Sequence, residues 1–261
     1  MLVARWALTA LVVYAALVAL AWAFQTRLIY PAPRSYVPVS PGFAEVRLRT
    51  ADGLSLRALE RPAQPGLPTA VHFHGNGGSL AGALVETHAL AQAGYGLLLV
   101  NYRGYGTNPG TPSEAGLYAD GRAAFAYLAQ QGIASADTIV MGNSIGSGPA
   151  TQMALEFRPR ALILVSPFTS LTDVAAETVW FLPVRRLLRD RFDNHAKIGR
   201  LPMPVLIQHG TADTLTPPDH ARKLSGVAPD ATLQLFEGSG HDLSFHREAQ
   251  AAQIRWLRQR P

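Results

Sequence analysis

The chain of 261 residues contains no cysteine. Disulfide bonds, thiolate catalysis and cysteine-based metal sites are therefore excluded, and cysteine usage assigns no redox compartment. Lysine is scarce as well, because it occurs only at Lys197 and Lys223, and the net charge of +5 comes from scattered arginines. No basic run with interleaved aromatic residues occurs, so the sequence does not indicate a nucleic-acid partner.

A stretch near the N-terminus, residues 6–24, has no charged residue, no proline and no glycine. Its length is close to the ~20 residues that a helix needs to cross a bilayer. Arg5 precedes the stretch, Arg27 follows it, and tryptophans lie near both of its ends, as interfacial aromatic residues do. We therefore predict a single-pass N-terminal membrane anchor at residues 1–27.

Two other interpretations of this stretch are open. Residues 21–23 read Ala-Trp-Ala, which resembles a signal-peptidase cleavage site, so a cleaved signal peptide is one alternative. A buried amphipathic helix is the weaker one, because the stretch is apolar on all sides. Basic residues are nearly balanced at the two ends, and the positive-inside rule therefore assigns no side of the membrane.

After the anchor, apolar strand patterns alternate with helical patterns. The predicted strands are residues 45–50, 54–60, 69–74, 96–100, 138–141, 161–165, 204–208 and 232–236. The predicted helices are residues 80–93, 113–131, a helix ending near 157, 218–224 and 243–258. Ala51-Asp52-Gly53 joins the first two strands as in a hairpin. The alternation predicts one α/β domain over residues 28–261, with a mostly parallel sheet, helices on both faces and an antiparallel edge.

The most informative short motif is Gly142-Asn143-Ser144-Ile145-Gly146, which reads G-x-S-x-G. It follows a predicted β-branched strand and precedes a predicted helix, the context of a nucleophile elbow. In such an elbow the serine lies at a tight turn, where flanking glycines avoid a Cβ clash. Ser144 is therefore the candidate nucleophile, provided that other parts of the chain supply a base, an acid and oxyanion donors.

A serine hydroxyl is a weak nucleophile until a base takes its proton, and histidine has a suitable pKa. His241 lies in a glycine-rich loop after the last predicted strand and is the candidate base, with His246 as the alternative. Asp213 follows the strand before that and is the candidate acid, with Asp173 as the alternative. The order Ser144, Asp213, His241 matches the order of nucleophile, acid and histidine in alpha/beta hydrolases.

An oxyanion requires two preorganised N–H donors. The amide of Ile145, directly after the nucleophile, is the first candidate. The second is the amide of Asn76, with Gly77 as the alternative, in the glycine-rich loop after the third predicted strand. We expect His74 to support this loop rather than to exchange protons. The glycines at 75–78 precede no Lys-Ser/Thr pair, so a phosphate-binding loop is not supported.

Taken together, the chain resembles the alpha/beta-hydrolase superfamily, and most closely its membrane-anchored branch of esterase-, lysophospholipase- and protein-depalmitoylase-like enzymes. The motifs that carry the resemblance are FHGNGGS (73–79), NYRGYG (101–106), PSEAGLYAD (112–120), GNSIGSG (142–148), SPFTSL (166–171), HGTADTLTP (209–217) and GSGHD (238–242). The resemblance implies an alpha/beta-hydrolase fold, the triad Ser144, Asp213 and His241, the same oxyanion pair, and an N-terminal anchor.

Enzymes of this kind carry a cap where this chain has residues 166–201. The cap is short here and contains the apolar segment Trp180-Phe181-Leu182-Pro183-Val184. Two interpretations of that segment are equally open. Its side chains could receive an acyl chain above the nucleophile, or they could simply pack on the sheet.

The sequence thus predicts a membrane-tethered serine hydrolase that cleaves ester or thioester bonds through an acyl-enzyme. The expected partners are a small-molecule or lipid-like acyl ester substrate and, through the N-terminal helix, the membrane. No metal, cofactor or nucleic acid is expected. A serine peptidase or amidase with the same triad is one alternative, and a non-catalytic binding protein on the same fold is another.

Overall fold

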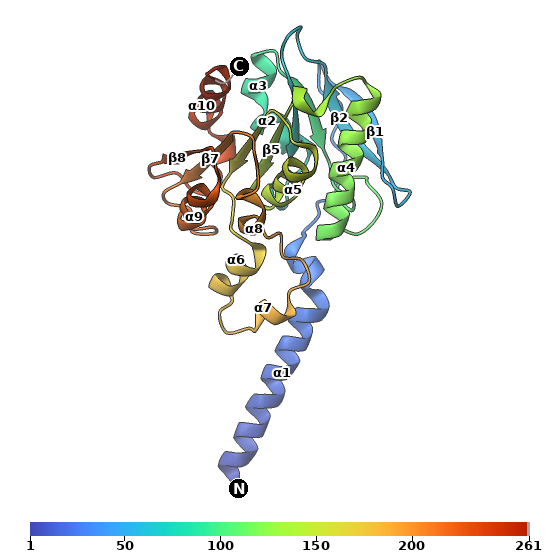
Figure 1. The fold of residues 1–261 in the computed structure, drawn as a ribbon. Helices are drawn as coiled ribbons and strands as arrows, with labels where there is room; N and C mark the ends of the chain where they lie inside the picture. The colour runs from blue at the N-terminus through green and yellow to red at the C-terminus, as the bar shows by residue number, and fades with distance from the viewer. Residues whose placement is uncertain (260–261) are drawn as a thin grey trace.

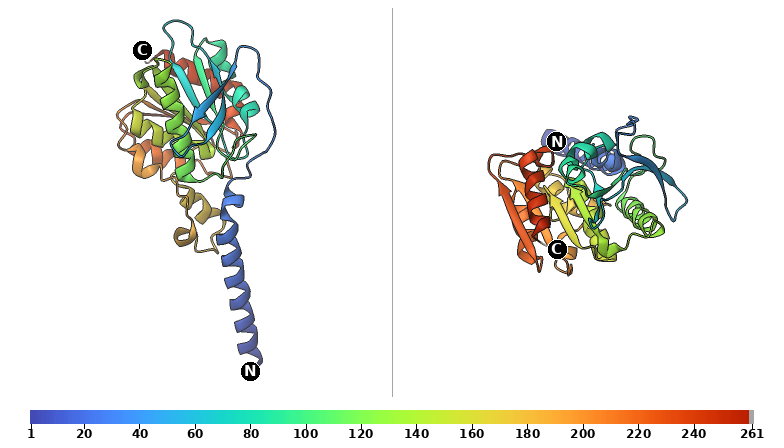
Figure 2. Two further views of the ribbon diagram at one scale, coloured as in Figure 1. Left: turned by 90° about the vertical axis from the view of Figure 1, so that its right-hand side faces the viewer. Right: turned by 90° about the horizontal axis from the view of Figure 1, so that it is seen from above.

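The computed structural model describes residues 1–259, and one long helix projects from the rest of the chain (Figure 1). The projecting helix is α1 (Leu2–Ile29), and the N-terminus lies at its far end. The last two residues of the predicted domain, 28–261, lie outside the described residues. The domain itself is a central sheet with helices on either side, as the two further views make plain (Figure 2).

Within the described residues the strands form one eight-stranded sheet in the order β1-β2-β4-β3-β5-β6-β7-β8. The strands are β1 (Ala44–Arg49), β2 (Ser55–Arg61), β3 (Thr69–Phe73), β4 (Gly96–Val100), β5 (Thr138–Asn143), β6 (Ala161–Val165), β7 (Val205–Gly210) and β8 (Ala231–Phe236). β2 is antiparallel to both of its neighbours, and all pairs from β4 to β8 are parallel. The predicted fold class is therefore confirmed, including its antiparallel hairpin edge.

The helices cover the sheet in two layers. One layer contains α2 (Leu80–Glu86), α3 (His88–Gln92) and α10 (Arg247–Arg258), and the other contains α4 (Glu114–Gln130), α5 (Ser147–Phe157) and α9 (Asp219–Val227). Successive residues of β4 alternate between the two cores, with Leu97 and Leu99 in one and Leu98 and Val100 in the other. Both faces of β4 are buried, and this explains why all of its residues are apolar.

Thr87 interrupts the helix predicted at residues 80–93, which the structure divides into α2 and α3. Its hydroxyl donates to the carbonyl of Ala83 at 2.7 Å. A threonine side chain that bonds four residues back competes with the backbone ladder and bends a helix. The preceding residue, Glu86, ends α2 and is buried.

The predicted helix at residues 243–258 is also shorter than expected. Residues Leu243–Phe245 form a single 3-10 turn (η3), His246 is extended, and α10 begins at Arg247. Ser244 causes this interruption, because its hydroxyl bonds Asn143 and its carbonyl accepts from Gln250. The local pattern was helical, but a contact with a distant strand takes precedence.

The segment between β6 and β7 forms the cap, with α6 (Leu171–Thr178), α7 (Val184–Leu187) and α8 (His195–Ile198). In Figures 1 and 2, α6 and α7 extend beyond the sheet and lie beside α1. α1 is the one helix among residues 1–259 whose length and composition would suit a membrane span, and none of its apolar window is buried.

A buried ion pair fixes the NYRGYG loop to α4. Arg103 bonds Asp120 through both its amide and its guanidinium, at 2.9 and 2.8 Å, and Asp120 is fully buried. The same guanidinium lies 2.7 Å from Asp52, whose side chain is half exposed. Burial raises the pKa of Asp120 to about 6 despite the opposing guanidinium.

Asp120 and Asp52 bond the same guanidinium, so removing each in turn compares the stability contributed by a buried and by an exposed ion pair. Asp120→Ala leaves the guanidinium buried without its inner partner and should lower the free energy of unfolding by about 3 kcal/mol. Asp52→Ala removes a solvent-screened partner and should lower it by less than about 1 kcal/mol. Urea denaturation of both variants measures the two values, and equal losses would contradict this assignment.

Candidate active site

The turn after β5 holds Ser144 in a conformation that a non-glycine residue rarely adopts. Its φ is +51°, in the left-handed region, and the 3-10 turn η2 (Ser144–Gly146) leads directly into α5. Such strain persists only where the surroundings impose it, and it is frequent at functional sites. The turn places Ser144 at the carboxyl edge of the sheet, above the N-terminus of α5, where the helix dipole favours negative charge.

The two glycines of the G-x-S-x-G motif are needed for space. A Cβ on Gly146 would lie 2.1 Å from the carbonyl oxygen of Phe73 and 2.7 Å from that of His74. A Cβ on Gly142 would lie 2.5 Å from the carbonyl oxygen of Gly146. Both glycines have negative φ, so only Ser144 carries the unusual backbone torsion. The backbone after the serine thus runs against the end of β3.

The structure brings the three residues of the predicted triad together. His241 Nε2 lies 2.8 Å from Ser144 Oγ, and His241 Nδ1 lies 2.8 Å from Asp213 Oδ2. The three side chains follow β5, β7 and β8, and all three strands end at the same edge of the sheet. Ser144 is 9% exposed and Asp213 is 3% exposed, so the hydroxyl adjoins the surface while the carboxylate is enclosed.

Asp213 is held as a carboxylate by its hydrogen bonds. Burial opposes its ionisation, but hydrogen bonds from His209, His241 and the Thr216 amide outweigh burial and hold the pKa of Asp213 well below its ordinary value. Thr216 donates its amide to Oδ1 and its hydroxyl to Oδ2, both at 3.0 Å. These roles of His209 and Thr216 were not predicted, although both residues lie in the HGTADTLTP motif.

The alternative acid and base lie elsewhere. Asp173 is in the first turn of α6, where it accepts from Thr169 and Ser170 and pairs with Arg185 at 3.0 Å. These contacts give Asp173 a capping role at the N-terminus of α6. His246 lies 3.4 Å from Asp242 and precedes α10, rather than lying inside a helix as predicted.

The candidate oxyanion donors lie on both sides of the elbow. The Ile145 amide follows Ser144, and Ile145 itself is buried. Asn76 is exposed, and its Oδ1 accepts from the Gly77 amide at 3.0 Å and from the Tyr105 hydroxyl at 3.4 Å. In the loops of the described residues, no backbone hydrogen bond uses the Asn76 amide. The oxyanion roles of Ile145 and Asn76 remain predictions.

His74 is wholly buried under this loop. Its Nδ1 lies 2.9 Å from the carbonyl oxygen of Gly75, and its ring packs against Tyr102 and Tyr105. Burial lowers the pKa of His74, which favours the neutral ring. These contacts agree with a supporting role for His74.

A second polar cluster beneath the elbow was not predicted. Asn143, the residue before Ser144, donates to Glu86 Oε1 at 3.0 Å and to Ser244 Oγ at 2.9 Å. His72 Nε2 lies 2.8 Å from Glu86 Oε2. Burial would raise the pKa of Glu86, but His72 and Asn143 hold it below its ordinary value. The cluster joins the elbow to α2 and to the segment after His241.

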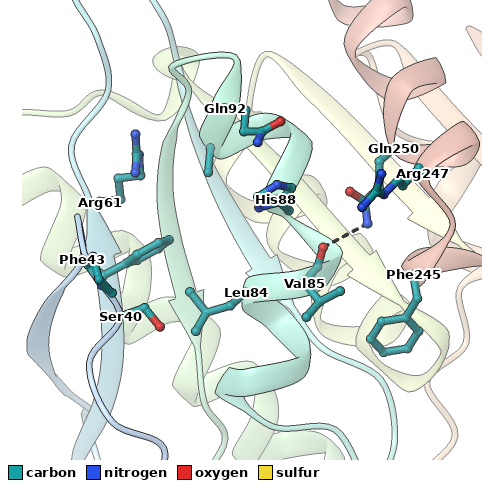
Figure 3. A pocket seen from close by; sticks show the side chains of 12 residues that line it. Ser40, Phe43, Arg61, Leu84, Val85, His88, Gln92, Phe245, Arg247 and Gln250 are labelled. Atoms are coloured by element: carbon teal, nitrogen blue, oxygen red, sulfur yellow. Dashed lines mark hydrogen bonds between the residues drawn. The ribbon is translucent and has the colours of Figure 1, made fainter.

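A groove elsewhere on the domain is separate from these residues. It has a volume of about 510 Å³ and lies between the segment before β1, helices α2 and α3, and the start of α10 (Figure 3). Gln250 crosses one end of it and donates to the carbonyl of Val85. None of Ser144, Asp213 and His241 lines this groove. Among residues 1–259, no group of three or more metal-binding side chains forms a metal site.

Sequence comparisons place the chain among known proteins. A family model described as "Serine aminopeptidase, S33" matches residues 68–196. The protein bem46 of Schizosaccharomyces pombe is 32% identical over 232 residues, which cover 80% of this chain and 76% of the relative. The chain belongs to the alpha/beta-hydrolase superfamily.

Other relatives of this alpha/beta hydrolase agree with the assignment. An uncharacterised protein of Mycobacterium tuberculosis is 36% identical over 229 residues, which cover 85% of this chain and 82% of the relative. An alpha-beta hydrolase of Vibrio vulnificus superposes with a TM-score of 0.76 at 22% identity, covering 90% of this chain and 92% of that one. An esterase of Pyrococcus furiosus superposes with a TM-score of 0.71 at 17% identity, covering 87% and 96%. The two structures share the fold of this alpha/beta hydrolase.

Gly146 and Gly226 allow a test of the close approach at the elbow. Gly146→Ala drives a Cβ into two backbone carbonyls and should abolish esterase activity, while lowering the thermal midpoint by several degrees. Gly226→Ala, in α9 with open space around the position, should leave the midpoint unchanged or raise it. Differential scanning fluorimetry with an ester assay measures both. An active, equally stable Gly146→Ala enzyme would contradict the geometry.

The depressed pKa of Asp213 makes a prediction about pH. Its contribution to stability is fully present above its unfolded pKa of about 4 and is lost as the pH falls towards its lower folded pKa. The stability difference between wild type and Asp213→Asn should therefore shrink from about pH 6 to about pH 3. Urea denaturation across this range tests the sign, and a difference that grows towards acid would overturn it.

Proposed function

We propose that this alpha/beta hydrolase is a membrane-anchored serine hydrolase that cleaves carboxylic ester or thioester bonds of lipid-like or acylated substrates. The observation that carries the proposal is the chain of contacts Ser144–His241–Asp213, with 2.8 Å at each step. A hydroxyl in contact with an imidazole, which in turn contacts a buried carboxylate, has the arrangement required for nucleophilic catalysis.

In the first half-reaction, Ser144 Oγ attacks the carbonyl carbon while His241 Nε2 takes its proton. The carbonyl oxygen becomes an oxyanion, which the amides of Ile145 and Asn76 would stabilise. Asp213 holds the ring through Nδ1 and stabilises its cation. Collapse of the tetrahedral intermediate breaks the bond to the leaving alcohol or thiol, which receives the proton from His241 and departs.

The second half-reaction regenerates the enzyme. Water attacks the acyl carbon of the Ser144 ester, and His241 Nε2 accepts the water proton. The bond between the acyl carbon and Ser144 Oγ then breaks, His241 returns the proton to Oγ, and a carboxylic acid leaves. Every proton movement in this scheme uses the chain's own groups, and the proposed reaction requires no metal and no cofactor.

The lipid-like substrate class is supported by the position of the candidate site relative to α1. α1 has the length and hydropathy of a membrane span, and its exposed apolar surface would be solvated by lipid. The cap and α1 lie on the same side of the domain (Figure 1), and the cap follows β6, which ends at the same sheet edge as β5, the strand before Ser144. An enzyme tethered in this way would meet acylated molecules at the bilayer.

Amide cleavage is the second candidate, and the description of the matching family model as a serine aminopeptidase favours it. The same three groups can cut an amide if His241 protonates the leaving amine. Comparison of aminoacyl-anilides with p-nitrophenyl acyl esters separates the two activities. Turnover of the anilides without turnover of the esters would replace the proposed function.

The nucleophile and the acid are tested by four full-length proteins in detergent. Ser144→Ala should abolish labelling by a fluorophosphonate probe and lower ester turnover by at least about 10³-fold. Asp213→Asn should lower turnover by about 10⁴-fold, because the amide neither fixes the required tautomer of the imidazole nor stabilises its cation. Asp173→Asn should retain most of the wild-type rate.

Each outcome has a clear meaning. Equal labelling of wild type and Ser144→Ala would show that the nucleophile assignment is wrong. A larger loss from Asp173→Asn than from Asp213→Asn would move the acid to Asp173. An unlabelled, inactive wild type would favour a non-catalytic binding protein on this fold.

A further inference from the structure

The turn between α6 and α7 exposes an unusual amount of apolar surface. Residues 179–184 read Val-Trp-Phe-Leu-Pro-Val and are called the cap tip below. Trp180 is 80% exposed and Phe181 is 47% exposed. The interpretation that these side chains pack on the sheet is therefore wrong for both residues. Contiguous exposed apolar surface of this kind marks an interaction site.

The cap tip is bonded to α1 rather than to the sheet. The Tyr14 hydroxyl donates to the carbonyl of Phe181 at 2.8 Å. Closer to the domain, Gln25 donates to the carbonyl of Leu187 at 3.3 Å and accepts from the Arg189 amide at 2.9 Å. The cap therefore runs alongside the domain-proximal half of α1, as Figures 1 and 2 show.

These contacts place the cap tip at a definite level along α1. Tyr14 lies about 15 Å from Phe24 along the helix axis, at ~1.5 Å per residue. Half of the hydrocarbon core of a bilayer is also about 15 Å thick. If residues 6–24 span the hydrocarbon, the side chains of Trp180 and Phe181 lie within it, because their turn is bonded to Tyr14.

Part of the backbone of the cap tip is hydrogen-bonded within the protein. Within the turn, the Leu182 amide donates to Val179 at 2.9 Å and the Val184 amide donates to Leu182 at 2.8 Å. The carbonyl of Phe181 receives the hydroxyl of Tyr14. Non-helical backbone is tolerated at membrane depth only when its polar groups find protein partners.

Two of the arginines that follow the cap tip, Arg185 and Arg189, hold their guanidinium groups in contacts away from the tip. Arg189 lies 4.3 Å over the ring of Trp22, near the domain end of the apolar run. Arg185 directs its guanidinium back to Asp173 at 3.0 Å, in the first turn of α6 and away from the tip. Arginine side chains that reach towards water from an embedded backbone are typical of membrane interfaces.

The base of the cap is fastened to the elbow helix. Asn194 Nδ2 donates to Ser147 Oγ and to the carbonyl of Phe168, both at 3.0 Å. A Cβ on Gly148 would lie 2.3 Å from the ring of Phe192. The segment that leads from the cap back to the sheet therefore packs directly against the start of α5. The position of the cap tip therefore sets the position of Ser144 relative to the bilayer.

We infer that the cap tip is a second membrane-embedded element. Together with α1 it would hold the carboxyl edge of the sheet, where Ser144 lies, against one phospholipid leaflet. Substrate acyl chains would then pass from that leaflet to Ser144 without crossing bulk water. This inference rests on the proposed anchoring by α1 and on the proposed hydrolysis at Ser144. The experiment must therefore distinguish embedding of the cap tip from anchoring by α1 and from hydrolysis at Ser144.

The absence of cysteine from the chain permits single-site labelling of the full-length protein. Phe181→Cys, Leu11→Cys in α1 and Val227→Cys are each labelled with a nitrobenzoxadiazole fluorophore in phosphatidylcholine vesicles. Nitroxide groups on the lipid acyl chains then serve as quenchers. Val227 has exposure comparable to that of Phe181 (39% against 47%) and ends α9 just before β8, at the opposite edge of the sheet from Ser144.

The probe at position 181 should lose fluorescence at least about two-fold more than the probe at 227, because only the former lies among acyl chains. The probe at position 11 should be quenched as well. Quenching at 11 but not at 181 would overturn this inference and leave the anchor intact. No quenching at either position would overturn both. Ser144→Ala, which tests the hydrolase proposal, should not alter quenching.

A functional comparison provides a second measurement. The double variant Trp180→Ser and Phe181→Ser keeps the backbone bond to Tyr14 but loses the two aromatic side chains. We compare its turnover of a long-chain ester in vesicles with its turnover of p-nitrophenyl acetate. The ratio of the two should fall about tenfold, which corresponds to a loss of ~1.4 kcal/mol in the free energy of binding to the bilayer. An unchanged ratio would show that the cap tip does not seat the enzyme on lipid.

Discussion

The backbone that follows Ser144 passes against the end of β3, and the rest of the site depends on this close approach. A side chain at Gly146 would overlap the carbonyls of Phe73 and His74, so β3 and β5 must end side by side with no atoms between them. At this turn Ser144 takes a left-handed torsion. The same approach brings the loop after β3, with its candidate oxyanion amide, next to the nucleophile. One steric constraint thus sets the serine, its torsion and its neighbouring loop.

Around this turn, buried polar groups are arranged in two clusters, one around Asp213 and one around Glu86. In the first, Asp213 is enclosed, but its hydrogen bonds hold its pKa below the ordinary value, and its Oδ2 lies 2.8 Å from His241 Nδ1. In the second, Glu86 and His72 lie under the elbow and hold Asn143. Burial would make isolated charges of this kind costly, so each cluster is stable only while its members stay together.

The connections at the carboxyl edge determine what the site faces. β6 leads into the cap, the cap runs alongside α1, and its return segment is fastened to the helix after Ser144. A long exposed apolar helix and an exposed aromatic turn therefore lie on one side of the domain, and the turn belongs to the cap that leaves the carboxyl edge of the sheet after β6. Water is a poor solvent for both surfaces, and a lipid leaflet would cover both at once.

The sequence by itself determined the alternation of strands and helices, the G-x-S-x-G turn and the order of the polar residues after the strands. These are local signals, because apolar periodicity and turn residues act over a few positions. It also supplied Ser144, Asp213 and His241 as candidates, since parallel strands end at one edge. Only the tertiary structure decided the breaks at Thr87 and His246, the contact of Asn143 with Ser244, the support of Asp213 by His209, and the course of the cap along α1. Each of these depends on packing between segments that the fold brings together or on a side chain's burial, and no local pattern records such contacts.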